Sequence, residues 1–136
     1  IRSALRVPDD APHLLVTTPL GQMHELGALF VATLAATEGW RTTYLGSNIA
    51  ADDIAAAASQ QRARVVALSI VYSIDAEVLA EQLHQLRERL GSGAIILAGG
   101  AGAAQCRAQL QRINAIYIDE FAQLRPTLSA IRLSAA

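Results

Sequence analysis

His24 is the residue of this chain whose side chain is best suited to chemistry. It follows a short apolar run, residues 13–18, and lies in the segment Gln22-Met23-His24-Glu25-Leu26-Gly27. A neutral imidazole can bind a metal ion through one ring nitrogen, and the other ring nitrogen then needs a hydrogen-bond partner. Gln22 could accept that N–H through its amide oxygen, although it carries no negative charge. The alternative is that His24 simply begins a helix in solvent.

Two later segments place small or polar residues where apolar runs end. Ser69 closes one run and is followed by Ile70-Val71, and Gly99-Gly100 closes another. Paired glycines let a backbone approach a flat ring without a Cβ in the way. Each feature also has an ordinary interpretation: a serine at a strand end, a strand-to-helix turn at Gly99-Gly100, and a loop glycine at Gly27.

Strand-like and helix-like segments alternate along the whole chain, which predicts a parallel sheet covered by helices on both faces. We expect a flavodoxin-like α/β fold with five strands in the order 2-1-3-4-5. Residues 1–12 are expected to be a linker and residues 13–136 one domain. The predicted strands are 13–18, 41–45, 65–70, 94–98 and 115–118, and the predicted helices are 26–39, 51–61, 75–90, 103–111 and 122–133.

The candidate residues should meet at one edge of that sheet. In open α/β sheets, ligands bind outside the carboxyl ends of the strands, at the point where the strand order reverses. In the predicted order this point lies between the first and third strands. The loops there are 19–27 and 70–74, with 99–102 beside them, so the sequence predicts a ligand site formed by these three loops.

Composition excludes several classes of protein. With 136 residues, 52% of them hydrophobic and 17% charged, the chain predicts one globular domain. The net charge of −1 gives no electrostatic reason to bind nucleic acid. The single Cys106 excludes an internal disulfide and suits a reducing cytoplasm. No apolar run is long enough for a membrane span, and the start at Ile1 suggests a piece of a longer protein.

The three motifs together resemble those of cobalamin-binding domains. Residues 22–27 resemble the Asp-x-His-x-x-Gly loop, with Gln22 in place of Asp; Ser69-Ile70-Val71 resembles Ser-x-Leu, and Gly99-Gly100 matches Gly-Gly. The resemblance implies that His24 binds cobalt from below and that Ser69 touches the displaced dimethylbenzimidazole tail. Val71 keeps the apolar contact of the usual Leu with one carbon fewer. The implied cofactor-binding residues are Gln22, His24, Glu25, Gly27, Ser69, Val71, Gly99 and Gly100.

Within that family, the chain most resembles the cobalamin-binding domain of MerR-type, light-sensing transcription regulators, from about Ala11 to about Leu128. The segments that carry this resemblance are 18–21, 24–29, 38–40, 44–46 and 67–72. It implies a cytoplasmic sensor module that is not an enzyme, with adenosylcobalamin, or else methylcobalamin, as cofactor. The helical bundle above the cofactor and the DNA-binding domain would lie outside this chain. The domain itself should contact neither nucleic acid nor membrane, and self-association remains open.

Two other interpretations compete with a sensor. A corrinoid carrier of a methyltransferase or mutase system has the same fold and histidine loop, but a carboxylate partner for the histidine is usual there. A flavodoxin-like domain without cobalamin is the second rival. A phosphate receiver needs an Asp where Ser69 ends the third strand, and a dinucleotide-binding domain needs Gly-x-Gly-x-x-Gly where residues 17–22 read Thr-Thr-Pro-Leu-Gly-Gln.

Overall fold

The computed structural model of the chain describes residues 10–71 and 75–134. The predicted linker 1–12 falls mostly outside these ranges. Ala11, which lies inside them, is buried, and its carbonyl oxygen accepts a hydrogen bond from Arg41 Nε at 2.8 Å. Among the described helices, none combines the length and the apolar character that crossing a membrane requires.

Five parallel strands form the centre of the molecule, in the order β2-β1-β3-β4-β5. This confirms the predicted sheet and its strand order. β3 is buried along its whole length and β1 along most of it, as expected for strands covered on both faces. The strands are β1 His13–Thr17, β2 Arg41–Tyr44, β3 Val65–Ser69, β4 Ile95–Gly99 and β5 Ile116–Ile118.

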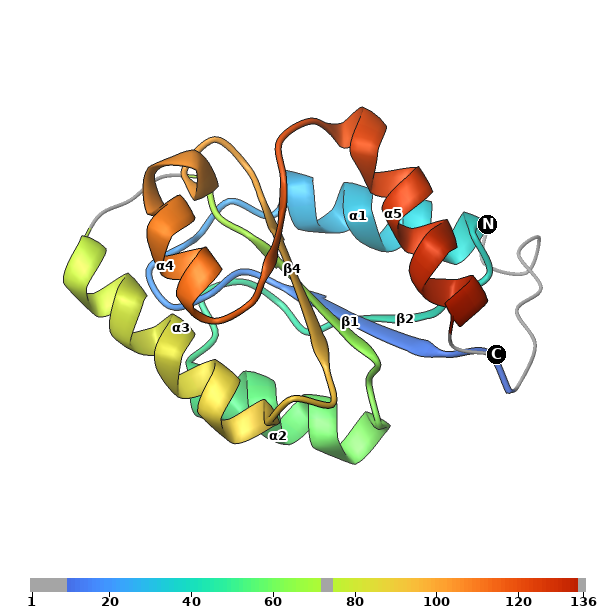
Figure 1. Ribbon diagram of the computed structural model, residues 1–136, viewed down its shortest axis with the longest axis horizontal. Helices are drawn as coiled ribbons and strands as arrows, with labels where there is room; N and C mark the ends of the chain where they lie inside the picture. Colours follow the sequence, from blue (N-terminus) through green and yellow to red (C-terminus); the bar gives the residue numbers. More distant parts are fainter. Residues whose placement is uncertain (1–9, 72–74, 135–136) are drawn as a thin grey trace.

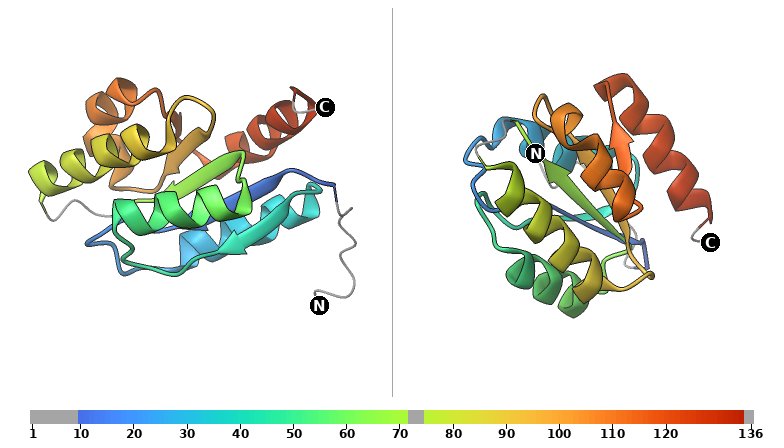
Figure 2. Two further views of the ribbon diagram at one scale, coloured as in Figure 1. Left: turned by 90° about the horizontal axis from the view of Figure 1, so that it is seen from below. Right: turned by 60° about the vertical axis from the view of Figure 1, so that its left-hand side comes forward.

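Helices cover the two faces of the sheet unequally. α1 and α5 lie together on one face, whereas α2, α3 and α4 cover the other (Figures 1 and 2). The buried side chains accordingly form two separate clusters, one on each face. The helices are α1 Leu26–Thr37, α2 Ala51–Gln61, α3 Ala76–Leu90, the short 3₁₀ helix η2 Ala103–Cys106, α4 Arg107–Arg112 and α5 Phe121–Ser134.

α3 shows how local sequence determines a helix in this fold. The Asp75 side chain accepts hydrogen bonds from the backbone N–H groups of Glu77 and Val78 and so caps the first turn. Leu79, Leu83 and Leu86 are buried at the spacing of one helix face. Gly91, with a φ of 71°, ends the helix where L-residues are disfavoured.

The predicted helical segment 103–111 is confirmed, and it consists of two parts: its first turn is the 3₁₀ helix η2, and the α-helix α4 follows. A 3₁₀ turn aligns side chains three residues apart. Ala103 and Cys106 are both buried in the cluster shared with α3, which the tighter turn allows. Cys106 then leaves helical geometry with φ −115° and ψ 26°, and α4 begins at Arg107.

α1 packs on the sheet through its small residues. Ala28 and Ala35, two turns apart, are its buried residues. Leu26 is 84% exposed and Phe30 48% exposed. Leu26 and Phe30 therefore face largely away from the core, whereas Leu34 is half-buried against it. Because the helix sequence is apolar on every side, it does not predict which side is buried.

Candidate functional site

A cavity opens on the α1/α5 face of the sheet, at the carboxyl ends of β3 and β4. Its floor follows from the alternation of side chains along a strand, which sends residues 65, 67 and 69 of β3 to the same face. Those side chains change from the larger Val65 to the small Ala67 and Ser69. In β4, paired in register, the large Ile95 and Leu97 are followed by Gly99. The space that the small residues leave is a cavity of about 440 Å³.

Five of the eight predicted site residues line this cavity: Gly27, Ser69, Val71, Gly99 and Gly100. The remaining three lie on the loop between β1 and α1 and do not line it. Gln22 is buried beside a smaller hollow of about 110 Å³, and His24 and Glu25 are exposed. The structure therefore brings the later motifs into one hollow and places the histidine loop next to it, since Gly27 belongs to both.

Ser69 places a polar side chain among the residues that line the cavity. The residue is only 6% exposed. A serine hydroxyl can donate and accept hydrogen bonds, so a molecule in the cavity could contact it. A Cβ added at Gly27 would lie 2.8 Å from Ser69 Oγ. A glycine at this position therefore leaves the serine hydroxyl uncrowded.

The structure explains the glycines at positions 99 and 100 in different ways. Gly100 has a φ of 109°, and a Cβ there would lie 2.3 Å from the carbonyl oxygen of Ile70. The fold itself thus requires glycine at position 100, with or without a ligand. Gly99 is less constrained: its added Cβ would be 3.3 Å from the Ile118 carbonyl oxygen. Its missing side chain contributes directly to the depth of the cavity.

Gln22 ties the histidine loop to the end of β3. Gln22 is 3% exposed, and its Oε1 accepts a hydrogen bond from the Val71 backbone N–H at 2.9 Å. An amide oxygen has two lone pairs. If Gln22 also accepted the His24 ring N–H, as the sequence predicts, the same oxygen would serve both donors, and that contact stays a prediction.

The other side of the histidine loop is held by β2 and the residues after it. The Tyr44 hydroxyl donates a 2.6 Å hydrogen bond to Glu25 Oε1. Burial, followed by this hydrogen bond and the Glu25 charge, raises the pKa of Tyr44 to about 12. Asn48 Oδ1 accepts from the Gly21 backbone N–H at 2.8 Å, and the Asn48 N–H donates to Thr18 Oγ1 at 2.7 Å.

His24 is exposed between two anchored residues, Gln22 and Glu25. Within the described ranges, no three His, Cys, Asp or Glu side chains are grouped so as to hold a metal ion. The expectation that His24 binds a metal stays a prediction.

The sequence interpretation missed one wall of the cavity. The β5–α5 turn and the start of α5 contribute Tyr117, Ile118, Asp119, Glu120, Phe121 and Leu124, and α1 adds Val31. A signal for the turn was present, because β5 ends at the same edge of the sheet as β3 and β4. The small residues at the carboxyl ends of β3 and β4, Ala67, Ser69 and Gly99, were a second signal for the floor of the cavity.

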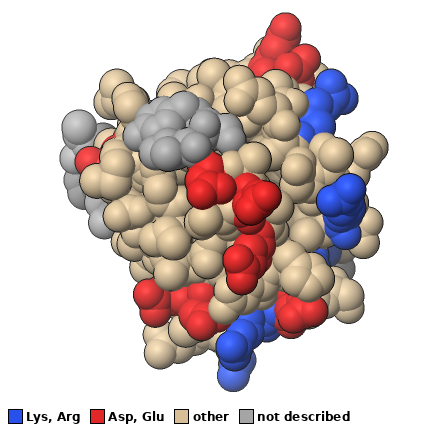
Figure 3. Space-filling model, turned by 90° about the vertical axis from the view of Figure 1, so that its left-hand side faces the viewer, with Lys and Arg blue, Asp and Glu red and all other residues tan. Residues whose placement is uncertain are grey.

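The surface near the cavity is apolar in one part and acidic in another. Phe121 of the cavity wall meets Phe30 of α1 edge to face, with ring centroids 4.6 Å apart, and both rings are about half exposed. Figure 3 looks at the molecule from the left side of Figure 1, where α3 begins. Among the described residues in that view, acidic side chains gather in the middle and basic ones lie toward the edges, so they form no basic cluster there for a nucleic-acid backbone.

The sequence is similar to those of known proteins. Residues 12–128 match the B12 binding domain family. The HTH-type transcriptional repressor CarA of Myxococcus xanthus is 30% identical over 97% of this chain and 48% of its own length. CarH of the same organism, also an HTH-type transcriptional repressor, is 36% identical over 66% of this chain and 30% of its own length.

The solved structures include a similar fold in the Methanosarcina barkeri monomethylamine corrinoid protein. It superposes with a TM-score of 0.72 at 17% identity, over 88% of this chain and 57% of the corrinoid protein.

The chain spans about half or less of the length of the two repressors that it matches. Because the family match extends over most of the chain, this protein belongs to the B12-binding domain family.

Proposed function

We propose that the chain is the cobalamin-binding sensor module of a MerR-type transcription regulator, with His24 as the lower ligand of cobalt. The observation that carries the ligand site is the cavity beside the His24 loop, which is lined by Gly27, Ser69 and Gly99. Cobalamin supplies a flat ring with a metal at its centre and a nucleotide tail. The exposed imidazole of His24 could bind the metal, and the neighbouring cavity could receive the tail.

Each site residue has a proposed role in this arrangement. His24 would bind the cobalt, and Gln22 would orient the histidine. Ser69 would offer its hydroxyl to the tail, while Gly27, Val71 and Gly99 line the channel that receives it. Gly100 would act indirectly, because it allows the loop after β4 to pass close to Ile70. Glu25 would hold the start of α1 through Tyr44.

The regulatory role rests on the two repressors. The match to CarA extends over nearly all of this chain and about half of CarA. A DNA-binding domain and a helical segment above the cofactor would therefore belong to other parts of the whole regulator. Adenosylcobalamin, whose cobalt–carbon bond is sensitive to light, is the proposed cofactor form, and the cytoplasm is the proposed location.

An absorption titration of the purified chain with hydroxocobalamin tests the ligand site. We expect binding with the spectrum of a histidine-bound, base-off cobalamin, and loss of that spectrum in His24→Ala. His84→Ala is the matched control, because His84 is exposed on α3, where it pairs with Glu88 at 3.0 Å. Absence of binding by the unaltered chain, or an unchanged spectrum in His24→Ala, would contradict the proposal.

A corrinoid carrier is the second candidate, and the fold shared with the monomethylamine corrinoid protein favours it. The two functions predict different behaviour of the full-length protein. A light-sensing regulator loaded with adenosylcobalamin should bind DNA in the dark and release it after illumination. A carrier should instead exchange a methyl group with a partner methyltransferase and show no DNA binding in either condition.

A further inference from the structure

The loop that carries His24 is anchored on two sides, by the segment after β3 and by β2. On one side, Gln22 accepts a hydrogen bond from the backbone N–H of Val71, two residues after β3 ends. On the other side, Tyr44, the last residue of β2, donates to Glu25. His24 lies between these two anchored residues, one position before Glu25 and two after Gln22. These two hydrogen bonds therefore constrain the backbone on both sides of His24.

Asn48 holds the same loop through the turn at residues 19–22. The Gln22 N–H bonds the Pro19 carbonyl at 3.0 Å, and Gly21 within this turn has a φ of 92°. The Gly21 N–H in turn donates to Asn48 Oδ1. Thr18, fully buried, accepts from the Asn48 N–H and donates to the Gln22 carbonyl oxygen. These bonds connect the turn to the segment that follows β2.

We propose that Tyr44 and Asn48 are positioning residues for the proposed cobalt ligand, acting through the loop that carries His24. The inference rests on the function proposed above. A metal ligand on a surface loop loses affinity if the loop must be ordered upon binding, because that ordering costs conformational entropy. Anchors on both sides of His24 remove that cost before the ligand arrives. This matters more here because Gln22 lacks the charge of a carboxylate partner.

Tyr44→Phe removes one hydroxyl and leaves the ring in place. We expect hydroxocobalamin to bind about three- to tenfold more weakly, the effect of losing one hydrogen bond, with less of the histidine-bound spectrum at saturation. A positioning role also makes a prediction for the double variant. In a His24→Ala background, Tyr44→Phe should cause no further loss of affinity, because the residue through which it acts is gone.

Asn48 provides a second, independent pair of variants. Its φ of 59° lies in the left-handed region, which Gly and Asp tolerate better than Ala. Asn48→Gly removes the acceptor for Gly21 without backbone strain, whereas Asn48→Asp keeps an acceptor oxygen. We expect weaker binding in Asn48→Gly and affinity close to the unaltered chain in Asn48→Asp. Trp40 fluorescence, from a buried tryptophan remote in sequence from the loop, checks that each variant is folded.

The outcomes separate this inference from the function on which it rests. Loss of affinity that is equal with and without His24 would assign Tyr44 a general structural role and overturn the inference. Unchanged affinity in both Tyr44→Phe and Asn48→Gly would overturn it as well, while the proposed function stood. If His24→Ala itself changed neither the affinity nor the spectrum, the proposed function would fail and the inference with it.

Discussion

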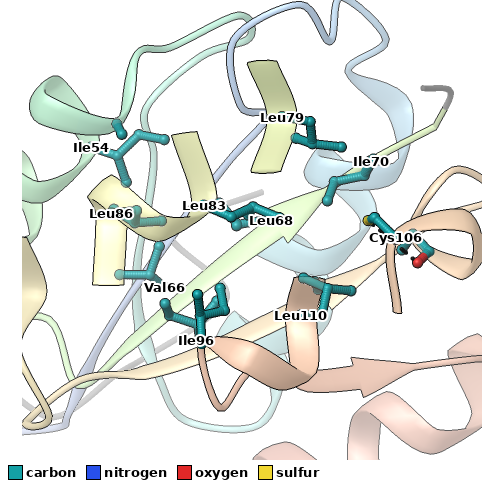
Figure 4. Close-up of a cluster of buried hydrophobic side chains, with 14 of the residues drawn as sticks. Ile54, Val66, Leu68, Ile70, Leu79, Leu83, Leu86, Ile96, Cys106 and Leu110 are labelled. Atoms are coloured by element: carbon teal, nitrogen blue, oxygen red, sulfur yellow. Dashed lines mark hydrogen bonds between the residues drawn. The ribbon is translucent and has the colours of Figure 1, made fainter. Parts of the chain in front are cut away.

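The two faces of the sheet are built from the same strands and are packed differently. On the α2/α3/α4 face, Leu68 of β3 and Ile70 just after it pack with Leu79, Leu83 and Leu86 of α3, and the space between them is filled with side chains (Figure 4). On the α1/α5 face, the residues that alternate with these, Ala67 and Ser69, are small and border the cavity. Large side chains thus fill one face at the end of β3, and small ones leave room on the other.

This difference assigns the two faces separate tasks. The filled face gains the dispersion and hydrophobic terms that stabilise the fold. The other face keeps a cavity that is lined partly by small residues, Ser69 and Gly99 among them. Stability should therefore respond most to changes on the filled face, and ligand binding most to changes around the cavity.

The largest effect is expected for Leu83→Ala on the filled face. Leu83 is 1% exposed and surrounded by core residues, so truncation should lower the free energy of unfolding by about 2–5 kcal/mol. The matched variant is Leu124→Ala, which is 2% exposed but borders the existing cavity. Leu124→Ala should lower the free energy of unfolding by about 2 kcal/mol, because it loses the transfer free energy of the removed methyl groups but creates no new cavity. Urea unfolding followed by Trp40 fluorescence measures both, and a larger cost for Leu124→Ala would contradict the comparison.

Gly100→Ala should come next, because Gly100 serves the backbone rather than the hollow. The added methyl group would meet the Ile70 carbonyl oxygen at 2.3 Å with the residue at a φ of 109°. We expect a loss of about 2–4 kcal/mol in unfolding free energy. Gly93→Ala is the control, since no atom lies within 4 Å of an added Cβ there. Equal stability of the two variants would show that the tight approach of Gly100 is not required.

Gly27→Ala should separate binding from stability. Alanine is the better helix former by about 1 kcal/mol, whereas its methyl group would displace the Ser69 hydroxyl 2.8 Å away. The net change in unfolding free energy should stay within about 1 kcal/mol, while hydroxocobalamin affinity falls about tenfold or more because the displaced side chain enters the cavity. Isothermal titration and urea unfolding of the same preparation test this. Unimpaired binding would argue against the cavity as the ligand channel.

The smallest effect concerns acid stability at the opposite end of the sheet. Burial, and then the nearby Arg41 charge, lower the pKa of His13 below its usual 6.5. The folded state thus prefers neutral His13, and its contribution to stability is complete above pH 6.5 and falls as the pH drops through the lowered folded-state pKa. The melting temperature should therefore decrease between pH 7.5 and pH 5, and less so in His13→Gln. Identical pH dependence of the two proteins would exclude this contribution.

The sheet, its order and most element boundaries could be predicted because the apolar runs are short, separated and regularly alternate with helical segments. The α1 orientation could not, since its residues are apolar on every side and only packing selects Ala28 and Ala35 for burial. The contact between Gln22 and Val71 joins residues 49 positions apart. Such a contact depends on how two distant segments meet in the fold, and no local sequence pattern predicts it.

The most direct test of the cobalt site is electron paramagnetic resonance of cob(II)alamin bound to the chain labelled with ¹⁵N-histidine. A nitrogen ligand splits the cobalt lines through its own nuclear spin, so ¹⁴N from the cofactor gives triplets and ¹⁵N from the protein gives doublets. If His24 is the lower ligand, the labelled chain should show doublets, which persist in His84→Ala and vanish in His24→Ala. Triplets in the labelled chain, or doublets that survive in His24→Ala, would contradict the account.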